Sequence, residues 1–426
     1  MSACASSRAT RHLPPVRTNR WAVAVVLTTA LVACSHSRSS PAGSALIVVN
    51  APFAAQPFVA NSMARGTELA VDEINGSGGV PVGNRKVKLQ VQRLDDNLSP
   101  ATSAANVRKA IDQHAVAVID EGTGTEASAP AAAAAGLPIG IVYEGGQSLV
   151  DRATRPSVFR IAPTDRGVSF RLAEYLVPKG LRIAVIHDDS TFGADGANAL
   201  DRAFAQNRDS VATTLTVPAS ANDPAPQVLE ARRSGATALL VWARPATVAT
   251  VVRSARASGW NVPVYSATSG EDPLVRQQLS DHPDWLDGLT FAASRLTSEK
   301  GPAPFEHFRT AYEGRFGAED VGVTSGPDRV VQPPDWAMYP YDFVHIVAAA
   351  MTKARSSTAS PELVAAMEQV EVPGANGDER SFNERNHEGV VDDDIFFASF
   401  RNMVWAPVKD DPLSATLPAI PQTKGK

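Results

Sequence analysis

The stretch that decides the fold is AVAVIDEGTGTEASAPAAAAAGLPIGIV, residues 115–142. It begins and ends with short apolar runs, 115–119 and 137–142, which are typical of strands buried on both faces of a sheet. Between them lie a small, glycine-rich and hydroxyl-bearing loop, 120–128, and an alanine-rich segment, 128–135, that predicts a helix. A strand, a helix and a second strand in so short a stretch predict a right-handed crossover and a parallel sheet.

The same alternation extends in both directions and forms two series. The first series predicts strands at Leu46–Val49, Val87–Val91, Ala115–Ile119 and Leu137–Val142, with helices at Asn61–Ile74, Thr102–Ile111 and Ser128–Ala135. The alternating pattern of Val87–Val91 predicts an edge strand. After Val158–Ile161, the second series predicts strands at Arg182–Ile186, Val211–Val217, Ala238–Val241 and Val262–Tyr265, and helices at Gly167–Leu176, Gly193–Gln206, Pro226–Ser234 and Thr247–Ser258. Later helices are predicted at Pro304–Phe316, Tyr341–Lys353 and Ser360–Val370, and one or two strands at Ile395–Val404.

Composition narrows the function classes. The chain has 426 residues and a formal net charge of −5, a length that allows more than one core. Four arginines and no acid lie within residues 1–33, so the remainder is more acidic still, which disfavours nucleic acid or an anionic membrane surface as partner. The two cysteines, Cys4 and Cys34, exclude a disulfide framework, and neither has neighbours that would make a metal site.

Residues 1–33 read as a targeting segment. A basic stretch is followed by the apolar run Trp21–Ala33, which is too short for a bilayer span of about 20 residues but fits a secretory signal. The run ends in Leu31-Val32-Ala33-Cys34, which resembles a bacterial lipobox, so Cys34 is the predicted lipidation site and 34–44 a lipidated tether. The alternative is an ordinary N-terminal membrane anchor with a chance cysteine. Either reading places the body outside the cytoplasm.

Several motifs resemble one known family. They are Gly66–Asn75 (GTELAVDEIN) followed by Gly78-Gly79-Val80, then Val158–Asp165 (VFRIAPTD), Ile183–Asp189 with Phe192-Gly193, and Tyr341-Asp342-Phe343. In order and spacing they look like the periplasmic branched-chain amino-acid-binding proteins of ABC transporters, over about residues 45–405.

The resemblance implies an α/β fold of two Rossmann-like lobes with parallel sheets, joined by a three-segment hinge. It implies lobe one from 45–162 plus 294–372, lobe two from 163–293 plus 373–410, and a tail at 411–426. Crossings are expected near Ala162–Thr164, near Phe291–Ser294, and between the Ser360–Val370 helix and Ile395.

Ligands of open parallel sheets lie beyond the carboxyl ends of the strands. In lobe one this rule selects the loop 120–128 and the loop 144–148. Free amides and hydroxyls at a helix start favour an anion, and the resemblance implies that these loops hold a ligand carboxylate. The candidate residues are Thr125, Ser128, Gly146 and Gln147, with Gln56 and Phe58 in the loop after the first strand. For Ser128, a helix N-cap is an equal alternative.

In lobe two, the candidates are Phe192, Arg244, Ser269 and Glu271. The family uses tyrosines and a glutamate there to hold an ammonium group, and this sequence departs at each point. A cation at Arg244 favours a ligand with an anionic or amide end on that side. The alternative for Arg244 is a solvated loop arginine.

Enzyme readings are weaker. Gly122-x-Gly124-x-x-Ala127, with Glu144 at the end of the next strand, matches a dinucleotide fingerprint, but it does not lie in the first strand–helix turn. His187 beside Asp188-Asp189 is an acid/base candidate, although such a trio more often caps a helix. Asp392–Asp394 is a weak cation candidate, with a loop cap as the alternative.

The sequence therefore predicts a lipid-anchored, extracytoplasmic solute-binding protein that is no enzyme. It would use no cofactor or metal, act as a monomer, and deliver a small polar solute (an amino acid, amide or carboxylate-like molecule) to an ABC permease with its ATPase subunits. A ligand-sensing receptor is the alternative, because a fold alone does not fix function.

Overall fold

The computed structural model describes residues 43–220, 223–294, 303–317, 322–325, 328–331, 335–390, 395–401, 403–416 and 424–425. The predicted signal segment, Cys34 and most of the tether lie outside the described residues, as does Asp392–Asp394.

Lobe one is the part of the chain packed around a six-stranded sheet, with the order β2-β3-β1-β4-β5-β6. Its strands are β1 (Ser44–Ala51), β2 (Val80–Val82), β3 (Arg85–Asp95), β4 (Ala117–Asp120), β5 (Ile139–Ile141) and β6 (Val158–Arg160). All neighbouring strands pair in parallel except β2 with β3. Its helices are α1 (Pro57–Gly76), α2 (Pro100–Asp112), α3 (Thr125–Ala135), α9 (Ala303–Phe316), α10 (Asp335–Ala354) and α11 (Pro361–Met367).

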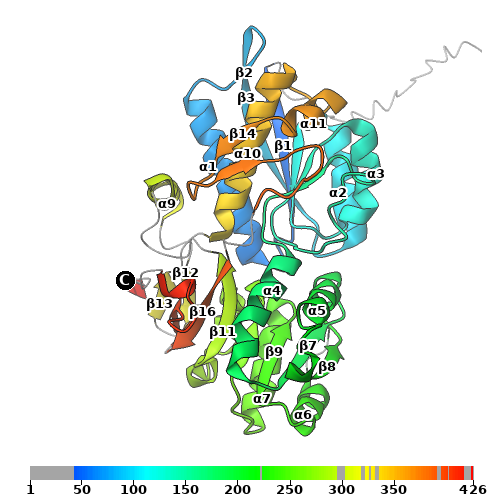
Figure 1. The fold of residues 1–426 in the computed structure, drawn as a ribbon. Helices are drawn as coiled ribbons and strands as arrows, with labels where there is room; N and C mark the ends of the chain where they lie inside the picture. The colour runs from blue at the N-terminus through cyan, green and yellow to red at the C-terminus, as the bar shows by residue number, and fades with distance from the viewer. Residues whose placement is uncertain are drawn as a thin grey trace, which may run out of the picture. The chain divides into compact units, whose positions relative to one another are not determined.

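The first sheet is covered on both faces. In β1, Ile47 and Val49 pack into a core with α1 and α10, whereas Val48 between them packs into a second core with α2 and α3. This alternation follows from the two-residue period of a strand and explains why the buried strands read as continuous apolar runs. Figure 1 shows α1 and α10 side by side on one face and α2 and α3 on the other.

The edge-strand prediction for Val87–Val91 is wrong in detail. That segment lies in β3, which pairs with β1 from Lys88 to Asp95. The edge strand is β2, which pairs with β3 only from Val80 to Val82. The alternating pattern of β3 reflects burial of one face only, since Val87 and Leu89 lie in the lobe-one core and Lys88 and Gln90 are exposed.

Lobe two is the part packed around a seven-stranded sheet, with the order β17-β16-β11-β10-β9-β7-β8. The strands are β7 (Ile183–Asp188), β8 (Val211–Val217), β9 (Ala238–Trp242), β10 (Val264–Ser266), β11 (Leu289–Ser294), β16 (Ile395–Arg401) and β17 (Val404–Pro407). Strands β7 to β11 run parallel, and β16 is antiparallel to β11 and β17. The helices are α4 (Asp165–Leu176), α5 (Thr191–Ala203), α6 (Ala225–Arg233), α7 (Pro245–Ala257) and α8 (Pro273–Gln278), with a short 3₁₀ helix, η3 (Thr268–Glu271).

The second sheet also separates two cores. One joins α4 and α5 to strand residues such as Val185 and Leu240, and the other joins α6 and α7 to residues such as Ile186 and Val241. Both predicted series of strands and helices, and the α/β class with two lobes, are confirmed.

Within the described residues the chain changes from one lobe's core to the other three times. It leaves lobe one between β6 and α4, returns between β11 and α9, and leaves again between Val390 and Ile395. These are the three crossings expected from the sequence.

Smaller elements complete the structure. The hairpin β14 (Glu371–Pro373) and β15 (Glu379–Ser381) lies beside α10, and β12 (Gly322–Ser325), β13 (Asp328–Val331) and β18 (Lys424–Gly425) form an antiparallel sheet. Ala375, Phe382 and Val390 belong to the lobe-one core. The predicted lobe boundaries remain a prediction, and we propose to move the last boundary from 373 to about residue 391.

Candidate ligand-binding site

Several polar groups of the loop after β4 form hydrogen bonds within that loop. The amide of Gly122 donates to Asp120 Oδ1 at 2.8 Å, and the amide of Thr123 donates to Glu121 Oε1 at 3.0 Å. Thr125 Oγ1 donates to the Gly122 carbonyl at 2.8 Å, and Ser128 Oγ to the Thr125 carbonyl at 3.2 Å. Two amides of the predicted anion cradle are therefore already bonded to side-chain carboxylates of the same loop.

The start of α3 also differs from the sequence-based alternative for Ser128. The N-cap is Gly124, in the left-handed conformation at φ 79°, and Ser128 lies inside the first turn. The N-cap interpretation of Ser128 is therefore wrong. A glycine fits this position because a side chain at positive φ is strained, and because a Cβ there would lie 2.7 Å from the Pro100 carbonyl.

The loop after β5 carries Glu144, whose side chain is almost fully buried. A Cβ on Gly122 would lie 2.4 Å from the Glu144 Cβ, so this glycine makes room for a side chain of its own chain. In a dinucleotide fingerprint the glycines leave room for the pyrophosphate, whereas here Glu144 fills the space beside Gly122, so the packing does not support the dinucleotide interpretation. Gly146 is buried and its carbonyl accepts from Arg160 Nη1 at 2.7 Å, whereas Gln147 is exposed.

Lobe two presents the strand ends of β7 and β9. Asp188, at the end of β7, accepts from the backbone amide of Arg244 at 2.6 Å and from Ser190, the N-cap of α5. The carboxylate of Asp188 thus fixes the start of α7 beside the start of α5. His187 Nδ1 lies 2.9 Å from the Asp188 carbonyl and its Nε2 3.0 Å from Thr216 Oγ1, so both ring nitrogens have partners within lobe two.

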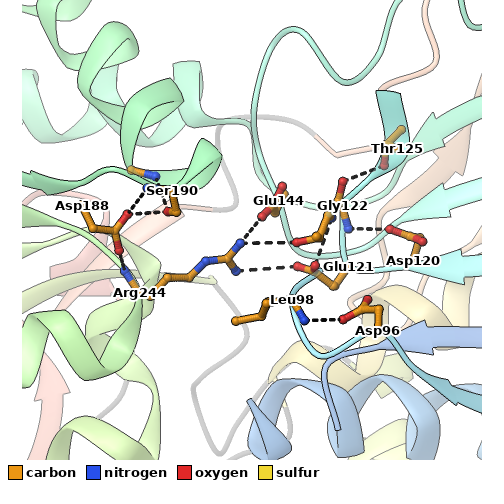
Figure 2. Close-up of polar contacts among 12 residues, drawn as sticks. Asp96, Leu98, Asp120, Glu121, Gly122, Thr125, Glu144, Asp188, Ser190 and Arg244 are labelled. Atoms are coloured by element: carbon orange, nitrogen blue, oxygen red, sulfur yellow. Dashed lines mark hydrogen bonds and ion pairs between the residues drawn. The ribbon is translucent and has the colours of Figure 1, made fainter. Parts of the chain in front are cut away.

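Arg244 connects the two lobes. Its Nη2 lies 2.5 Å from Glu144 Oε1 and 3.5 Å from Thr123 Oγ1, and its Nη1 lies 3.8 Å from Glu121 Oε2. Figure 2 shows the side chain reaching from lobe two toward these lobe-one residues. Because only 12% of the side chain is exposed, the solvated-loop interpretation of Arg244 is wrong.

Aromatic rings surround this ion pair. The Arg244 guanidinium carbon lies 5.3 Å from the centre of the Phe192 ring, within cation–π range. Phe192 stacks on Tyr143 of lobe one at 6.2 Å, and Tyr143 contacts Trp336 of α10 edge-on at 4.8 Å. The predicted site residue Phe192 therefore lies at the contact between the lobes.

Burial strongly raises the pKa values of several acids around Arg244. Burial, and then the charge of Glu121, raises the pKa of Asp96 to about 7 and the pKa of Asp120 well above its ordinary value. The same two causes raise the pKa of Glu144, while Arg244 opposes the rise. Burial lowers the pKa of Arg244, but the charges of Glu144 and Glu121 outweigh it, so the net shift is upward. The acids thus hold Arg244 in its charged form, while burial and the charge of Glu121 favour the protonated form of Glu144 and Arg244 opposes this.

The contacts of Arg244 described above involve none of the remaining predicted residues. Gln56 is the buried N-cap residue of α1, and Phe58 is partly buried against the lobe-one core. Ser269 and Glu271 are fully buried in η3, where the charge of Glu271 acts on Arg276. Whether any of them contacts a ligand stays a prediction.

Three residues at this contact are not among the candidates from the sequence. Glu121 and Glu144 lie in the two loops that the sequence selects, but Glu144 has a role of its own only in the dinucleotide fingerprint, and Tyr143 is not singled out. All three lie at strand ends, the position that the strand-end rule selects. The sequence does not reveal that Arg244 pairs with an acid about 100 residues earlier in the chain.

Other features do not extend the site. A cavity of about 510 Å³ lies between α6 and α7 of lobe two, lined by residues that include Val228, Leu229 and Arg253. In the part of the chain that the structure describes, no cluster of three His, Cys, Asp or Glu side chains has the arrangement of a metal site.

Two α/β lobes crossed by three segments, with strand-end loops facing each other, define a two-lobed binding protein. The chain belongs to the periplasmic binding protein family, whose model matches residues 48–402. A curated relative, Leu/Ile/Val-binding protein homolog 8 of Brucella abortus, is 26% identical over 279 residues, which cover 60% of this chain and 66% of the relative. The match thus spans just under two thirds of that relative's length.

Solved structures show the same fold. A type 1 periplasmic binding protein from Bordetella pertussis superposes with a TM-score of 0.74 at 20% identity, covering 84% of this chain and 96% of the other. A branched-chain amino acid transporter substrate binding protein from Streptococcus pneumoniae, in complex with isoleucine, gives 0.70 at 19% identity, with coverages of 85% and 97%. A solute binding protein of an ABC transporter from Rhodopseudomonas palustris, in complex with 3,4-dihydroxy benzoic acid, gives 0.67 at 19%, with coverages of 84% and 93%.

Proposed function

We propose that the chain is the solute-binding protein of an ABC transporter, which captures a small polar solute between its lobes and performs no covalent chemistry. The observation that carries this proposal is the meeting of strand-end loops from both lobes at Arg244 and Glu144. The similarity to proteins solved with isoleucine and with 3,4-dihydroxy benzoic acid supports a small organic solute. Delivery to a permease with ATPase subunits, as a monomer outside the cytoplasm, completes the proposed role.

The test is the identity of what the protein carries. Mass spectrometry of small molecules released from the purified protein should find a bound solute, and adding it back should raise the melting temperature. At about 100 times its dissociation constant, a ligand adds roughly 2.7 kcal/mol to the free energy of unfolding. If no solute is released and no compound in a thermal-shift screen of amino acids, amides, amines and carboxylates stabilises the protein, the proposal fails.

We also propose that Cys34 carries a lipid anchor. In the described part of the chain, no helix combines the length and apolarity needed to cross a membrane. Cys34→Ser should move the protein from the membrane fraction to the soluble fraction of its host, whereas Cys4→Ser should leave it in the membrane fraction. Membrane retention of Cys34→Ser would show that the anchor is an uncleaved N-terminal segment.

A further inference from the structure

The contacts of Arg244 show what kind of group the site accepts. Its guanidinium has a carboxylate at 2.5 Å, a second at 3.8 Å, a hydroxyl at 3.5 Å and an aromatic face at 5.3 Å. These are the partners that recognise an organic cation: carboxylates supply charge and acceptors, and an aromatic face adds cation–π attraction. All of them except the ring of Phe192 belong to lobe one.

Lobe one has more acceptor capacity here than its own chain uses. Glu121 is fully buried, and its Oε2 has no hydrogen-bond donor although it points toward Arg244 (Figure 2). Asp96 Oδ2 is likewise buried without a donor. Two amide donors of the neighbouring loop are already bonded to Asp120 and Glu121. This part of lobe one therefore offers a solute hydrogen-bond acceptors and few donors.

An anionic and a cationic group of a solute would affect this ion pair differently. An anionic group that paired with Arg244 would lie beside Glu121 and Glu144, which would lose their cation while still buried. Breaking a buried pair in this way is strongly unfavourable, because it leaves an uncompensated buried charge. A cationic group would take the place of the guanidinium, keep both carboxylates paired, and release a flexible side chain to water. The geometry favours the cation.

We propose that Glu121 and Glu144 bind an organic cation of the solute, an ammonium, amidinium or guanidinium group, and that Arg244 occupies their site until the solute displaces it. This inference rests on the proposed solute-binding function and narrows its solute class. It replaces the expectation of an anionic or amide end facing Arg244.

The first test empties the site and refills it. Arg244→Ala should lower the melting temperature by at least about 3 °C, and millimolar ethylguanidinium chloride should restore at least half of the loss. Tetramethylammonium chloride at the same concentration is the matched salt, because it carries the charge without a hydrogen-bond donor. Arg253→Ala, which removes an arginine from the outer part of α7 with an ion pair to Asp281 at 2.7 Å, is the control variant and should respond equally to both salts.

The second test uses the unaltered protein and stays informative if Arg244→Ala does not fold. Calorimetric titration with agmatine, a guanidinium-bearing amine, should show binding that Glu144→Gln weakens at least about tenfold. Isoleucine and 3,4-dihydroxybenzoate are the comparison solutes.

The outcomes separate this inference from the proposed function. Tight binding of isoleucine or the benzoate, unaffected by Glu144→Gln and without agmatine binding, overturns the cation inference and leaves solute binding intact. Equal response of Arg244→Ala to both salts, or no agmatine binding to the unaltered protein, also overturns it. Restoration by ethylguanidinium alone supports it even while the natural solute is unknown.

Discussion

At the scale of single residues, buried carboxyl groups set the response to pH. Asp165, the first residue of α4, is buried, and its Oδ2 has no hydrogen-bond donor. Burial raises its pKa from 3.8 to about 7, as it does for Asp96. The folded protein therefore holds protons that the unfolded chain releases between about pH 4 and pH 7. Its stability falls as the pH rises through that window.

We accordingly expect the melting temperature to decrease from pH 5 to pH 8. Asp165→Asn should flatten this profile by up to about 3 kcal/mol in the free energy of unfolding, since one pKa unit is worth about 1.4 kcal/mol. Urea unfolding at both pH values measures the effect. Asp201→Asn removes an exposed carboxylate of α5 and should leave the profile unchanged. A profile that rises with pH in both the wild-type protein and Asp165→Asn would contradict this account.

A second residue, Arg160, joins the site loop to the last crossing. Its Nε and Nη2 bond the Glu388 carboxylate at 2.7 and 2.5 Å, and its Nη1 donates to the Gly146 carbonyl at 2.7 Å. Arg160→Met should lower the free energy of unfolding by about 3 kcal/mol, because it leaves Glu388 unpaired and buried carbonyls unbonded. The double variant with Glu388→Gln should recover part of the loss in urea unfolding. An additive loss in the double variant would show that the two side chains act independently.

At the scale of helices, close approach between α1 and α10 is set by one glycine. A Cβ on Gly66 would lie 1.9 Å from the Ala337 carbonyl, so the helices cannot keep their spacing around any side chain. Gly66→Ala should lower the free energy of unfolding by about 3 kcal/mol. Gly76→Ala, at the exposed end of the same helix with open space around it, should be neutral or gain up to about 1 kcal/mol. Chemical denaturation of both variants decides the matter, and equal effects would refute the packing argument.

Elements with strong periodicity were predictable from the sequence, and elements that depend on partners were not. Helices such as α4 and strands such as β8 carry their pattern locally, so their bounds agree closely with prediction. The short strands β2 and β14 form only because a neighbouring segment pairs with them. The helix predicted at Tyr341–Lys353 is α10, which begins earlier, at Asp335, and contains Pro340.

The candidate site likewise has one part that the sequence predicts and one part that it does not. The strand-end rule finds the loops after β4, β5, β7 and β9 because it needs only element order. It does not reveal that Glu121 and Glu144 face Arg244, since that contact depends on how two separately folded sheets meet. The sequence predicts amides and hydroxyls that face a solute, and this stays a prediction; the structure adds two carboxylates that face Arg244.

At the scale of the whole molecule, three chain segments join the two lobes. The ion pair of Arg244 with Glu144 adds a direct contact between the lobes. A compact chain of this length has a radius of gyration of about 22 Å. Without solute, Arg244→Ala should increase the measured radius by a few per cent, because two buried carboxylates lose their cation and gain by hydration if the lobes separate. X-ray scattering at matched concentration measures this, with Arg253→Ala as the control.

Addition of a bound solute should then reduce the radius of both the wild-type protein and Arg244→Ala to one common value. A solute can shift the hinge only by the difference between its affinities for the separated and the joined lobes. In the wild-type protein Arg244 already supplies part of that joining energy, so the solute must displace it. In Arg244→Ala no displacement is needed, and the scattering change should appear at a lower solute concentration. A variant that needs more solute than the wild-type protein would show that Arg244 binds the solute instead of competing with it.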